Sequence, residues 1–300
     1  MYVLYANVCR EDLSFDMKKI LVALHIYYHD HVEYYIDKLA NINGCQWDLV
    51  VTYSEYSAAT EEKLKAFRPD VRLVKTENAG YDLWPFIKAL RLVDISSYDY
   101  ILKLHTKNTD VFKWKANGLR MKGNKWRNTL VDALLKTPEQ FRRCLDLFER
   151  HPDTGMVCSY ELLVGLTQRR REDLSMLRDE AARIGIGSVS GKFCAGTMFL
   201  VKAECMKKIR DSYVDADSWP SYSRSHSKGT LAHVYERLLS FAVSDSGYRI
   251  RTLAAYRKNV PSVFIHNTFS PVLKSLFTID RHGEDERKYL TILGIRIPLS

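Results

Sequence analysis

The chain has 300 residues, of which 46% are hydrophobic and 27% are charged, as in an ordinary soluble globular protein. This composition excludes a disordered chain, and the length allows one large α/β domain or two small ones. The net charge of +9 indicates an anionic partner, such as a nucleic acid, a phosphorylated ligand or an acidic membrane surface. No segment approaches the roughly 20 consecutive apolar residues of a membrane-spanning helix.

The N-terminal region and the cysteines carry no targeting or zinc signal. Residues 1–16 are expected to be an N-terminal extension. Met17 then begins a stretch like a signal peptide, but its apolar run is short, is interrupted by His25 and leads to no small-residue cleavage site. The six cysteines are scattered without the spacing of a zinc site. We therefore expect reduced structural thiols in a cytoplasmic protein.

The first 110 residues alternate apolar strands with helices of about ten residues. Strands are expected at Lys19–Tyr28, Trp47–Tyr53, Val71–Lys75 and Tyr98–Leu104, and helices at Val32–Ile42, at Ala58–Phe67 and from a start near Pro85. Such alternation indicates βαβ units. It predicts an α/β fold with a Rossmann-like, mainly parallel central sheet flanked by helices.

Polar and cationic residues follow the fourth predicted strand. The chain continues there as Leu104-His105-Thr106-Lys107-Asn108, and the carboxyl ends of strands are where open α/β sheets bind ligands. Because side chains alternate along a strand, Lys103, His105 and Lys107 are expected on one exposed face. This cluster suggests an anionic ligand. The alternative is that one lysine is a surface ion-pair partner and His105 a hydrogen-bonded structural residue.

The second part of the chain continues the domain to about residue 260. Lys113–Arg127 is basic and contains two glycines, which favours a loop. Asp211–Gly229 is rich in Ser, Asp and Tyr and is expected to be a mobile loop. Helices are expected at Asn128–Lys136, Pro138–Arg150, Thr167–Arg183 and Thr230–Ser244, and strands at Gly155–Tyr160, Phe193–Val201 and Tyr248–Leu253.

Three stretches of this order resemble a known family. They are NAGYDLWPF with ILKLHTK, then CAGTMFLVKAECM, then GTLAHVYERLLSFAVSDSGYRI, and they span about Lys19 to Leu253. The chain resembles GT-A type glycosyltransferases and, more narrowly, the rhamnan synthesis protein F family of bacterial polysaccharide enzymes. The resemblance implies one GT-A type domain over residues 17–260, with a nucleotide-sugar half (17–110) and an acceptor half (111–260).

The implied activity is transfer of a sugar, often rhamnose, from a nucleotide-diphosphate donor to a cell-surface glycan such as a capsule, lipopolysaccharide or O-antigen chain. His105-Thr106-Lys107 stands where such enzymes usually carry an Asp-x-Asp metal motif. We therefore expect cations to contact the pyrophosphate, with Mg²⁺ or Mn²⁺ compatible but not obligatory and no metal-ligating residues assigned. Tyr81 departs from the family pattern, which has arginine there.

The resemblance also implies which residues bind the donor. Its base and ribose are expected near the ends of the first two strands, and its pyrophosphate near the fourth. The expected donor residues are His25, Tyr27, Thr52, Ser54, Glu55, Asn78, Gly80, Lys103, His105, Thr106 and Lys107. Core packing is the alternative for His25 and Tyr27, and Asn78 and Gly80 are expected to shape a turn in either case.

Three residues are candidates for catalysis. Glu236 lies on the predicted helix before the SGYRI strand, the place where related enzymes carry the base of an inverting transfer, and His233 lies three residues earlier. Asp82 either orients the sugar or a lysine, or only favours the start of the helix after it. For Glu236 the alternatives are an exposed helix face or an ion pair inside the domain.

The acceptor side is expected to involve two further segments. Gly196 and Thr197 are predicted to let the acceptor approach the backbone. Asp217, Trp219 and Tyr222 are predicted to form a lid, with plain disorder as the alternative. The tail, residues 261–300, ends in an apolar strip beside basic residues. It is expected either to contact the anionic cytoplasmic face of the inner membrane or to be a strand packed on the body.

Two other function classes remain open from the sequence. A catalytically inactive sugar-binding scaffold of the same fold is favoured by the missing Asp-x-Asp motif. A basic nucleic-acid-binding protein is favoured by the net charge and by Lys113–Arg127, but no nucleic-acid-binding module is recognisable, and no nucleic acid partner is expected. The expected partners are a nucleotide sugar and a glycan or lipid-linked glycan acceptor.

Overall fold

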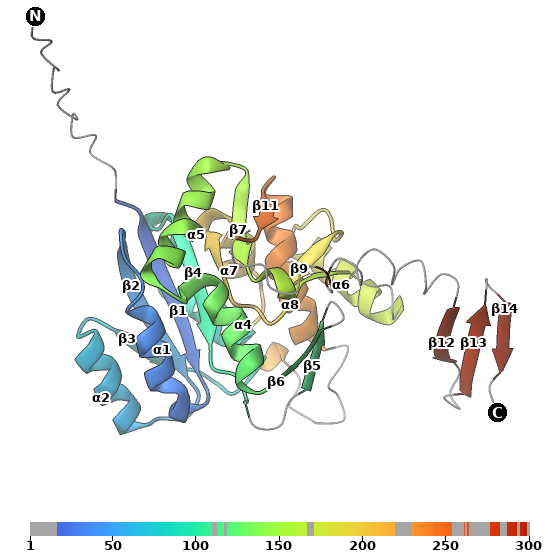
Figure 1. The fold of residues 1–300 in the computed structure, drawn as a ribbon, viewed down its shortest axis with the longest axis horizontal. Helices are drawn as coiled ribbons and strands as arrows, with labels where there is room; N and C mark the ends of the chain where they lie inside the picture. The colour runs from blue at the N-terminus through green and yellow to red at the C-terminus, as the bar shows by residue number, and fades with distance from the viewer. Residues whose placement is uncertain are drawn as a thin grey trace, which may run out of the picture.

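Seven strands form the central sheet of the protein, in the order β11-β7-β10-β4-β1-β2-β3 (Figure 1). The computed structural model describes residues 17–109, 113–116, 119–166, 171–219, 230–253, 261, 263, 277–282, 287–292 and 295–298. Residues 1–16, which are expected to be an N-terminal extension, and residues 220–229 therefore lie outside the described residues.

The N-terminal half is the parallel part of this sheet. Its elements are β1 (Lys19–Ile26), α1 (Val32–Leu39), β2 (Gln46–Tyr53), α2 (Ala58–Phe67), β3 (Arg72–Lys75), α3 (Leu83–Arg91) and β4 (Tyr100–His105), with short 3-10 turns at His29–His31 and Ile95–Ser97. β1 pairs in parallel with both β2 and β4, and β2 pairs in parallel with β3. The predicted βαβ order of this half is confirmed.

The second half adds three strands and most of the helices. Its elements in and around the central sheet are α4 (Asn124–Leu135), α5 (Pro138–Arg150), β7 (Thr154–Cys158), α6 (Arg171–Arg183), β10 (Phe199–Lys202), α7 (Lys207–Arg210), α8 (Leu231–Asp245) and β11 (Arg249–Arg251), with 3-10 turns at Tyr160–Leu162, Ala203–Met206 and Ala216–Ser218. β10 runs antiparallel to both β4 and β7, whereas β11 is parallel to β7. The sheet is therefore mostly parallel with one reversed inner strand.

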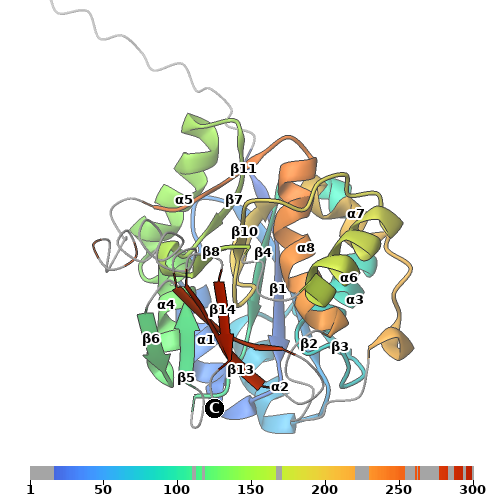
Figure 2. The ribbon, with the colours of Figure 1, turned by 90° about the vertical axis from the view of Figure 1, so that its right-hand side faces the viewer.

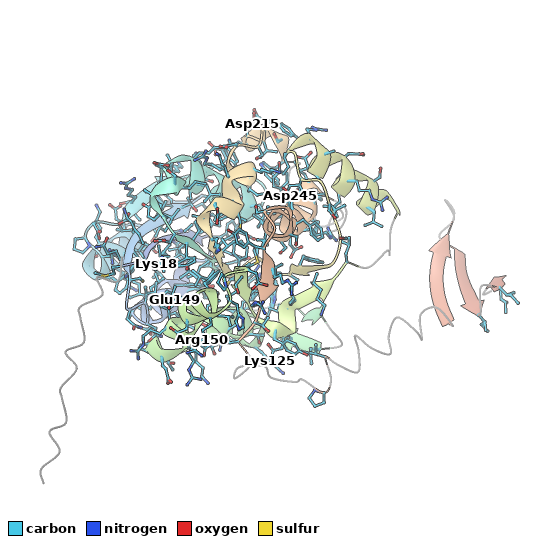
Figure 3. All side chains as sticks on the ribbon, turned by 90° about the horizontal axis from the view of Figure 1, so that it is seen from above. Lys18, Lys125, Glu149, Arg150, Asp215 and Asp245 are labelled. Atoms are coloured by element: carbon cyan, nitrogen blue, oxygen red, sulfur yellow. The ribbon has the colours of Figure 1, made fainter. Side chains whose placement is uncertain are left out.

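Strand alternation divides the core between the two faces of the sheet. On β1, Ile20 and Val22 belong to a buried cluster with α1, α4 and α5, while Leu21 and Ala23 belong to a cluster with α3 and α8. Figure 2 shows these helix groups on opposite sides of the sheet. Viewed from above, Asp215 lies on one side of the body and Glu149 of α5 on the other (Figure 3). This three-layer α/β arrangement confirms the predicted fold class.

The predicted strand Phe193–Val201 is wrong as a single strand. The structure divides it into β9 (Lys192–Cys194), which pairs with β8 (Leu163–Gly165), and β10 in the central sheet. The turn between them has φ angles of 83° at Gly196 and 53° at Thr197. A strand cannot continue through two left-handed residues, so the glycine marks a sharp turn.

The predicted loop at Lys113–Arg127 is also wrong. A hairpin of β5 (Lys113–Ala116) and β6 (Leu119–Lys122) occupies it, and α4 begins at Asn124, four residues before the expected start. The alternation in KWKA and LRMK is the strand period, and Met121 is buried at 2% exposure. Charge and glycine content obscured this alternation.

Three further expectations need correction. Helix α3 begins at Leu83, so Pro85 is its third residue and not its first. The described part of Asp211–Gly229 contains a 3-10 turn at Ala216–Ser218 that Asp215 caps, and Trp219 directly after it is buried. The tail contains three antiparallel strands and not one: β12 (Phe277–His282), β13 (Arg287–Ile292) and β14 (Ile295–Pro298).

Candidate functional site

Asp82 lies at the centre of a buried charged cluster. It directly precedes α3, yet its side chain makes no capping hydrogen bond to the helix. Its Oδ2 instead accepts hydrogen bonds from Lys103 Nζ and from Thr197 Oγ1, each at 2.5 Å. Its Oδ1 lies 3.4 Å from Nε2 of His105. Of the two roles predicted for Asp82, the geometry favours orientation of a lysine over stabilisation of the helix start.

Lys103 is fully enclosed and cannot be a phosphate contact in this conformation. It is only 1% exposed, and its Nζ lies 5.2 Å from the ring centroid of Phe86 on α3. Phe199 of β10 lies opposite Lys103 in the ladder. Its ammonium donates to Asp82, to the carbonyl of Thr197 at 3.0 Å and to Thr197 Oγ1 at 3.1 Å. An ammonium group has three donors, so all are used. The expectation that Lys103 contacts the pyrophosphate is corrected accordingly.

The ion pair of Asp82 and Lys103 controls the charge at this site. Burial lowers the pKa of Lys103, and the adjacent carboxylate of Asp82 opposes this change. Burial alone would raise the pKa of Asp82, but the neighbouring His105 and Lys103 reverse this, and the pKa lies well below its ordinary value. The carboxylate therefore stays ionised at neutral pH and is a poor acceptor for a proton.

His105 and His25 are buried neighbours on β4 and β1, and this corrects the expectation of an exposed polar strand end. Burial lowers the pKa of His105 well below its ordinary value and that of His25 to about 4. Nδ1 of His25 lies 3.1 Å from Oγ1 of Thr52. Neither ring nitrogen of His105 has a hydrogen-bond partner among the described residues. Both rings are therefore neutral at pH 7.

These neutral histidines predict that acid destabilises the fold. The unfolded chain protonates His25 near pH 6.5, whereas the folded protein does so near pH 4, so the unfolded state binds more protons between these values. Lowering the pH from 7 to 5 is therefore expected to cost about 2 kcal/mol of unfolding free energy through His25 alone. Urea unfolding at both pH values measures this cost. His25→Asn should remove about that part of the pH dependence, and an unchanged slope would contradict the assignment.

Glu236 joins the cluster through a turn of two residues. Its Oε1 accepts a hydrogen bond of 2.8 Å from the backbone N–H of Gly196, and the next residue, Thr197, binds both Asp82 and Lys103. Glu236 is half-buried on α8. Its second oxygen, Oε2, accepts no hydrogen bond from any residue that the structure describes. Two carboxylates 154 positions apart in the sequence thus meet at one turn.

Two glycine-led turns border the site. Gly80 and Tyr81 have φ angles of 61° and 56°, and Gly196 and Thr197 have 83° and 53°. A Cβ added to Gly80 would lie 2.5 Å from the ring of Trp219, and one added to Gly196 would lie 3.1 Å from Leu130. Both glycines are therefore required by backbone conformation and by close packing.

Lys107 is the predicted cation that remains accessible. It is half-buried, and its Nζ lies 4.7 Å from the ring centroid of Trp126. Thr106 beside it is buried, and its hydroxyl accepts hydrogen bonds from the backbone N–H groups of Tyr27 and Tyr28. Thr106 thus holds the β1 loop against β4, which is a structural role that the sequence did not indicate.

Other predicted donor residues divide by exposure. His25 and Thr52 bind one another in the interior, so stacking of a base on His25 is not supported. The exposed or half-buried ones are Tyr27, Ser54, Glu55 and Asn78.

The predicted catalytic and acceptor residues outside the cluster are scattered. His233 is half-buried, and its Nδ1 lies 2.8 Å from Thr230 Oγ1 at the start of α8. Asp217 is exposed, but Trp219 is 5% exposed and packs on Tyr235, so it is a core residue and not a lid. Tyr222 lies outside the described residues.

Within the described residues, no group of three or more His, Cys, Asp or Glu side chains could hold a metal ion. No described helix is long and apolar enough to cross a membrane. Asp82, the carboxylate at the centre of the site, is bound by Lys103 and Thr197. Whether transfer needs a metal is not tested by these contacts, so metal independence stays a prediction.

Sequence reasoning missed two features of this site. The first is the contact between Lys107 and the ring of Trp126, which belongs to the segment expected to be a loop. The backbone of Tyr81 is left-handed, which is uncommon for a bulky residue. In each of the two turns a glycine with positive φ precedes a second left-handed residue. The glycine was therefore the signal for a tight turn that the sequence offered.

Comparison with known proteins identifies a family for this chain. Residues 1–248 match the model of the family described as rhamnan synthesis protein F. Two curated relatives are similar, the uncharacterised proteins WxcX of Xanthomonas campestris pv. campestris strains B100 and ATCC 33913. Each is 30% identical over 180 residues, which is 59% of this chain and 24% of the relative. The chain thus spans about a quarter of the length of these relatives.

Solved structures show a slighter likeness. The Staphylococcus aureus TarS fragment 1–349 has a TM-score of 0.43 at 11% identity, over 80% of this chain and 58% of that one. The same fragment in complex with UDP-GlcNAc has a TM-score of 0.42 at 11% identity, over 80% and 56%. The likeness is too slight to carry an argument about the site.

Proposed function

Because the chain belongs to the rhamnan synthesis protein F family, we propose that it is a glycosyltransferase of polysaccharide synthesis. It transfers a sugar, with a rhamnose-like deoxysugar favoured, from a nucleotide-diphosphate donor to a glycan or lipid-linked glycan. The observation that carries this proposal is the Gly196–Thr197 turn. It connects Glu236, the candidate base, to the Asp82–Lys103 pair, which lies within the predicted donor half.

Glu236 is the better base of the two carboxylates. Asp82 is held ionised by Lys103, whereas Glu236 keeps one oxygen, Oε2, without a hydrogen bond among the described residues. In the proposed step, Oε2 takes the proton of the acceptor hydroxyl as the acceptor oxygen bonds the anomeric carbon. The bond between that carbon and the pyrophosphate breaks, and the nucleoside diphosphate leaves with the electron pair. The configuration at the anomeric carbon is inverted.

Lys107 is proposed to stabilise the departing pyrophosphate. Lys103 is neutralised by Asp82 and both histidines are uncharged, so Lys107 is the remaining positive charge of the KLHTK segment. A preorganised cation near developing negative charge lowers the barrier to transfer. Burial lowers the pKa of Lys107, and the carboxylate of Asp82 opposes this change.

This arrangement predicts turnover without a divalent metal. After treatment with EDTA and desalting, the initial rate of transfer is expected to stay within about twofold of the untreated rate, because Lys107 supplies the charge that a metal would supply. The Lys107→Met variant should instead lose about 10²-fold in kcat. Activity that disappears in EDTA and returns with Mg²⁺ or Mn²⁺ would contradict the prediction.

A panel of nucleotide sugars tests the function itself. The protein is incubated with each donor, with and without a glycan acceptor, and release of nucleoside diphosphate is measured. Release that depends on one donor class supports a transferase. Binding without release would favour the inactive sugar-binding scaffold, and salt-sensitive binding to RNA or DNA without nucleotide-sugar binding would favour a nucleic-acid-binding protein.

We propose a cytoplasmic location, with peripheral contact at the anionic inner membrane through the C-terminal tail.

A further inference from the structure

The strained non-glycine residues in the described part of the chain both lie next to the carboxylate of Asp82. Tyr81 and Thr197 are the two non-glycine residues with positive φ in the described part of the chain. Tyr81 precedes Asp82 directly, and Thr197 donates a hydrogen bond to Oδ2 of Asp82. Left-handed backbone is costly for a bulky side chain and persists where the surroundings impose it, which is most often at functional sites.

The two strained residues differ in what their side chains do. Thr197 is buried, and its hydroxyl and carbonyl accept hydrogen bonds from Lys103. These bonds offset the energetic cost of its left-handed backbone. The side chain of Tyr81 is 47% exposed. The strained backbone at Tyr81 therefore holds a large aromatic ring partly in solvent, directly before Asp82.

The turn that carries Tyr81 is fixed from both sides. On one side, Gly80 lies against the ring of Trp219, too close for any Cβ. On the other side, Asp82 is bound to Lys103. The backbone N–H of Leu83 also closes the turn on the carbonyl of Gly80 at 3.0 Å. The backbone of Tyr81 cannot relax to an ordinary conformation unless one of these contacts breaks, so the position from which its side chain leaves the turn is fixed.

We propose that Tyr81 is a stacking platform for a sugar ring of the substrate and helps to determine which sugar the site accepts. This inference rests on the proposed function. An aromatic face covers the apolar C–H face of a pyranose, and a tyrosine fixed by its backbone loses little freedom on binding. Asp82 beside it is held by β4 and by the turn before β10. Through Thr197 and Gly196 it is joined to Glu236, the proposed base, beside which the transferred sugar has to lie. A sugar is therefore favoured over a base.

Two variants separate this role from packing. Tyr81→Asn removes the ring, and asparagine tolerates left-handed backbone. It is expected to raise KM for the sugar substrate about five- to tenfold, with kcat little changed. Its melting temperature should stay equal or rise by about 2–4 °C, because strain is relieved. Tyr81→Phe keeps the ring and should stay within about twofold of the wild type in KM. A packing residue would instead lower the melting temperature when it is replaced by asparagine.

Three results would overturn the stacking role of Tyr81. The first is an unchanged KM in Tyr81→Asn, and the second is a large fall in melting temperature or loss of folding in either variant. The third is a loss of affinity for the free nucleoside diphosphate in Tyr81→Asn that equals the loss for the nucleotide sugar, which would place a base on the ring. KM values measured separately for donor and acceptor show which of the two sugars stacks. Absence of turnover in the wild type would overturn the proposed function. Calorimetric affinity of each variant for the nucleotide sugar would then still decide this inference.

Discussion

Glu236→Gln is expected to lower kcat of sugar transfer by about 10²- to 10⁴-fold, while the affinity for the nucleotide sugar stays unchanged. The amide oxygen of glutamine can accept the same hydrogen bond from the N–H of Gly196 that Oε1 accepts at 2.8 Å. The turn, and with it Thr197 and the Asp82–Lys103 pair, should therefore keep its geometry. What is lost is the ability of the second oxygen to take a proton from the acceptor.

Steady-state kinetics together with calorimetry of donor binding measure this effect. Glu62→Gln is a matched control, since Glu62 is an exposed residue of α2 on the same domain, and its kinetics should equal those of the wild type. Near-normal turnover in this variant would remove Glu236 from the role of base.

Local patterns determined much of the fold. The bounds of α2 and α5 were predicted to the residue from their helical spacing, and in the structure a serine or threonine side chain caps the start of each helix. β1 was predicted from its apolar run, since a strand buried on both faces has no polar side. These features depend only on neighbours in the sequence.

The site could be predicted only in part, because its burial depends on distant pairing. Alternation placed Lys103 and His105 on one face of β4, and both reach Asp82. Nothing local showed that the reversed strand β10 would lie beside β4, with the turn before it at Lys103. The same distant pairing brought Thr197 to Asp82 and Gly196 to Glu236. An exposed cation cluster was expected, and a buried ion pair was found.

That buried pair gives the largest expected effect on stability. Lys103→Met keeps a chain of similar length but removes the ammonium, and it leaves Asp82 enclosed with no opposite charge at 2.5 Å. Removing one partner of a buried ion pair costs about 3–5 kcal/mol. We therefore expect the unfolding free energy in urea at pH 7 to fall by about this amount. Lys88→Met is the matched control, because its pair with Glu77 is more exposed and should be worth less than about 1 kcal/mol.

A double variant separates the pair from the packing around it. When Asp82→Asn is added to Lys103→Met, the unpaired charge is gone, and the total loss should be smaller than the sum of the two single losses by about 1–3 kcal/mol. Strict additivity would mean that Lys103 stabilises the fold through Thr197 and its alkyl chain alone. In that case Asp82 would be free to bind a substrate or a metal. The coupling energy thus decides whether this carboxylate serves the fold or the chemistry.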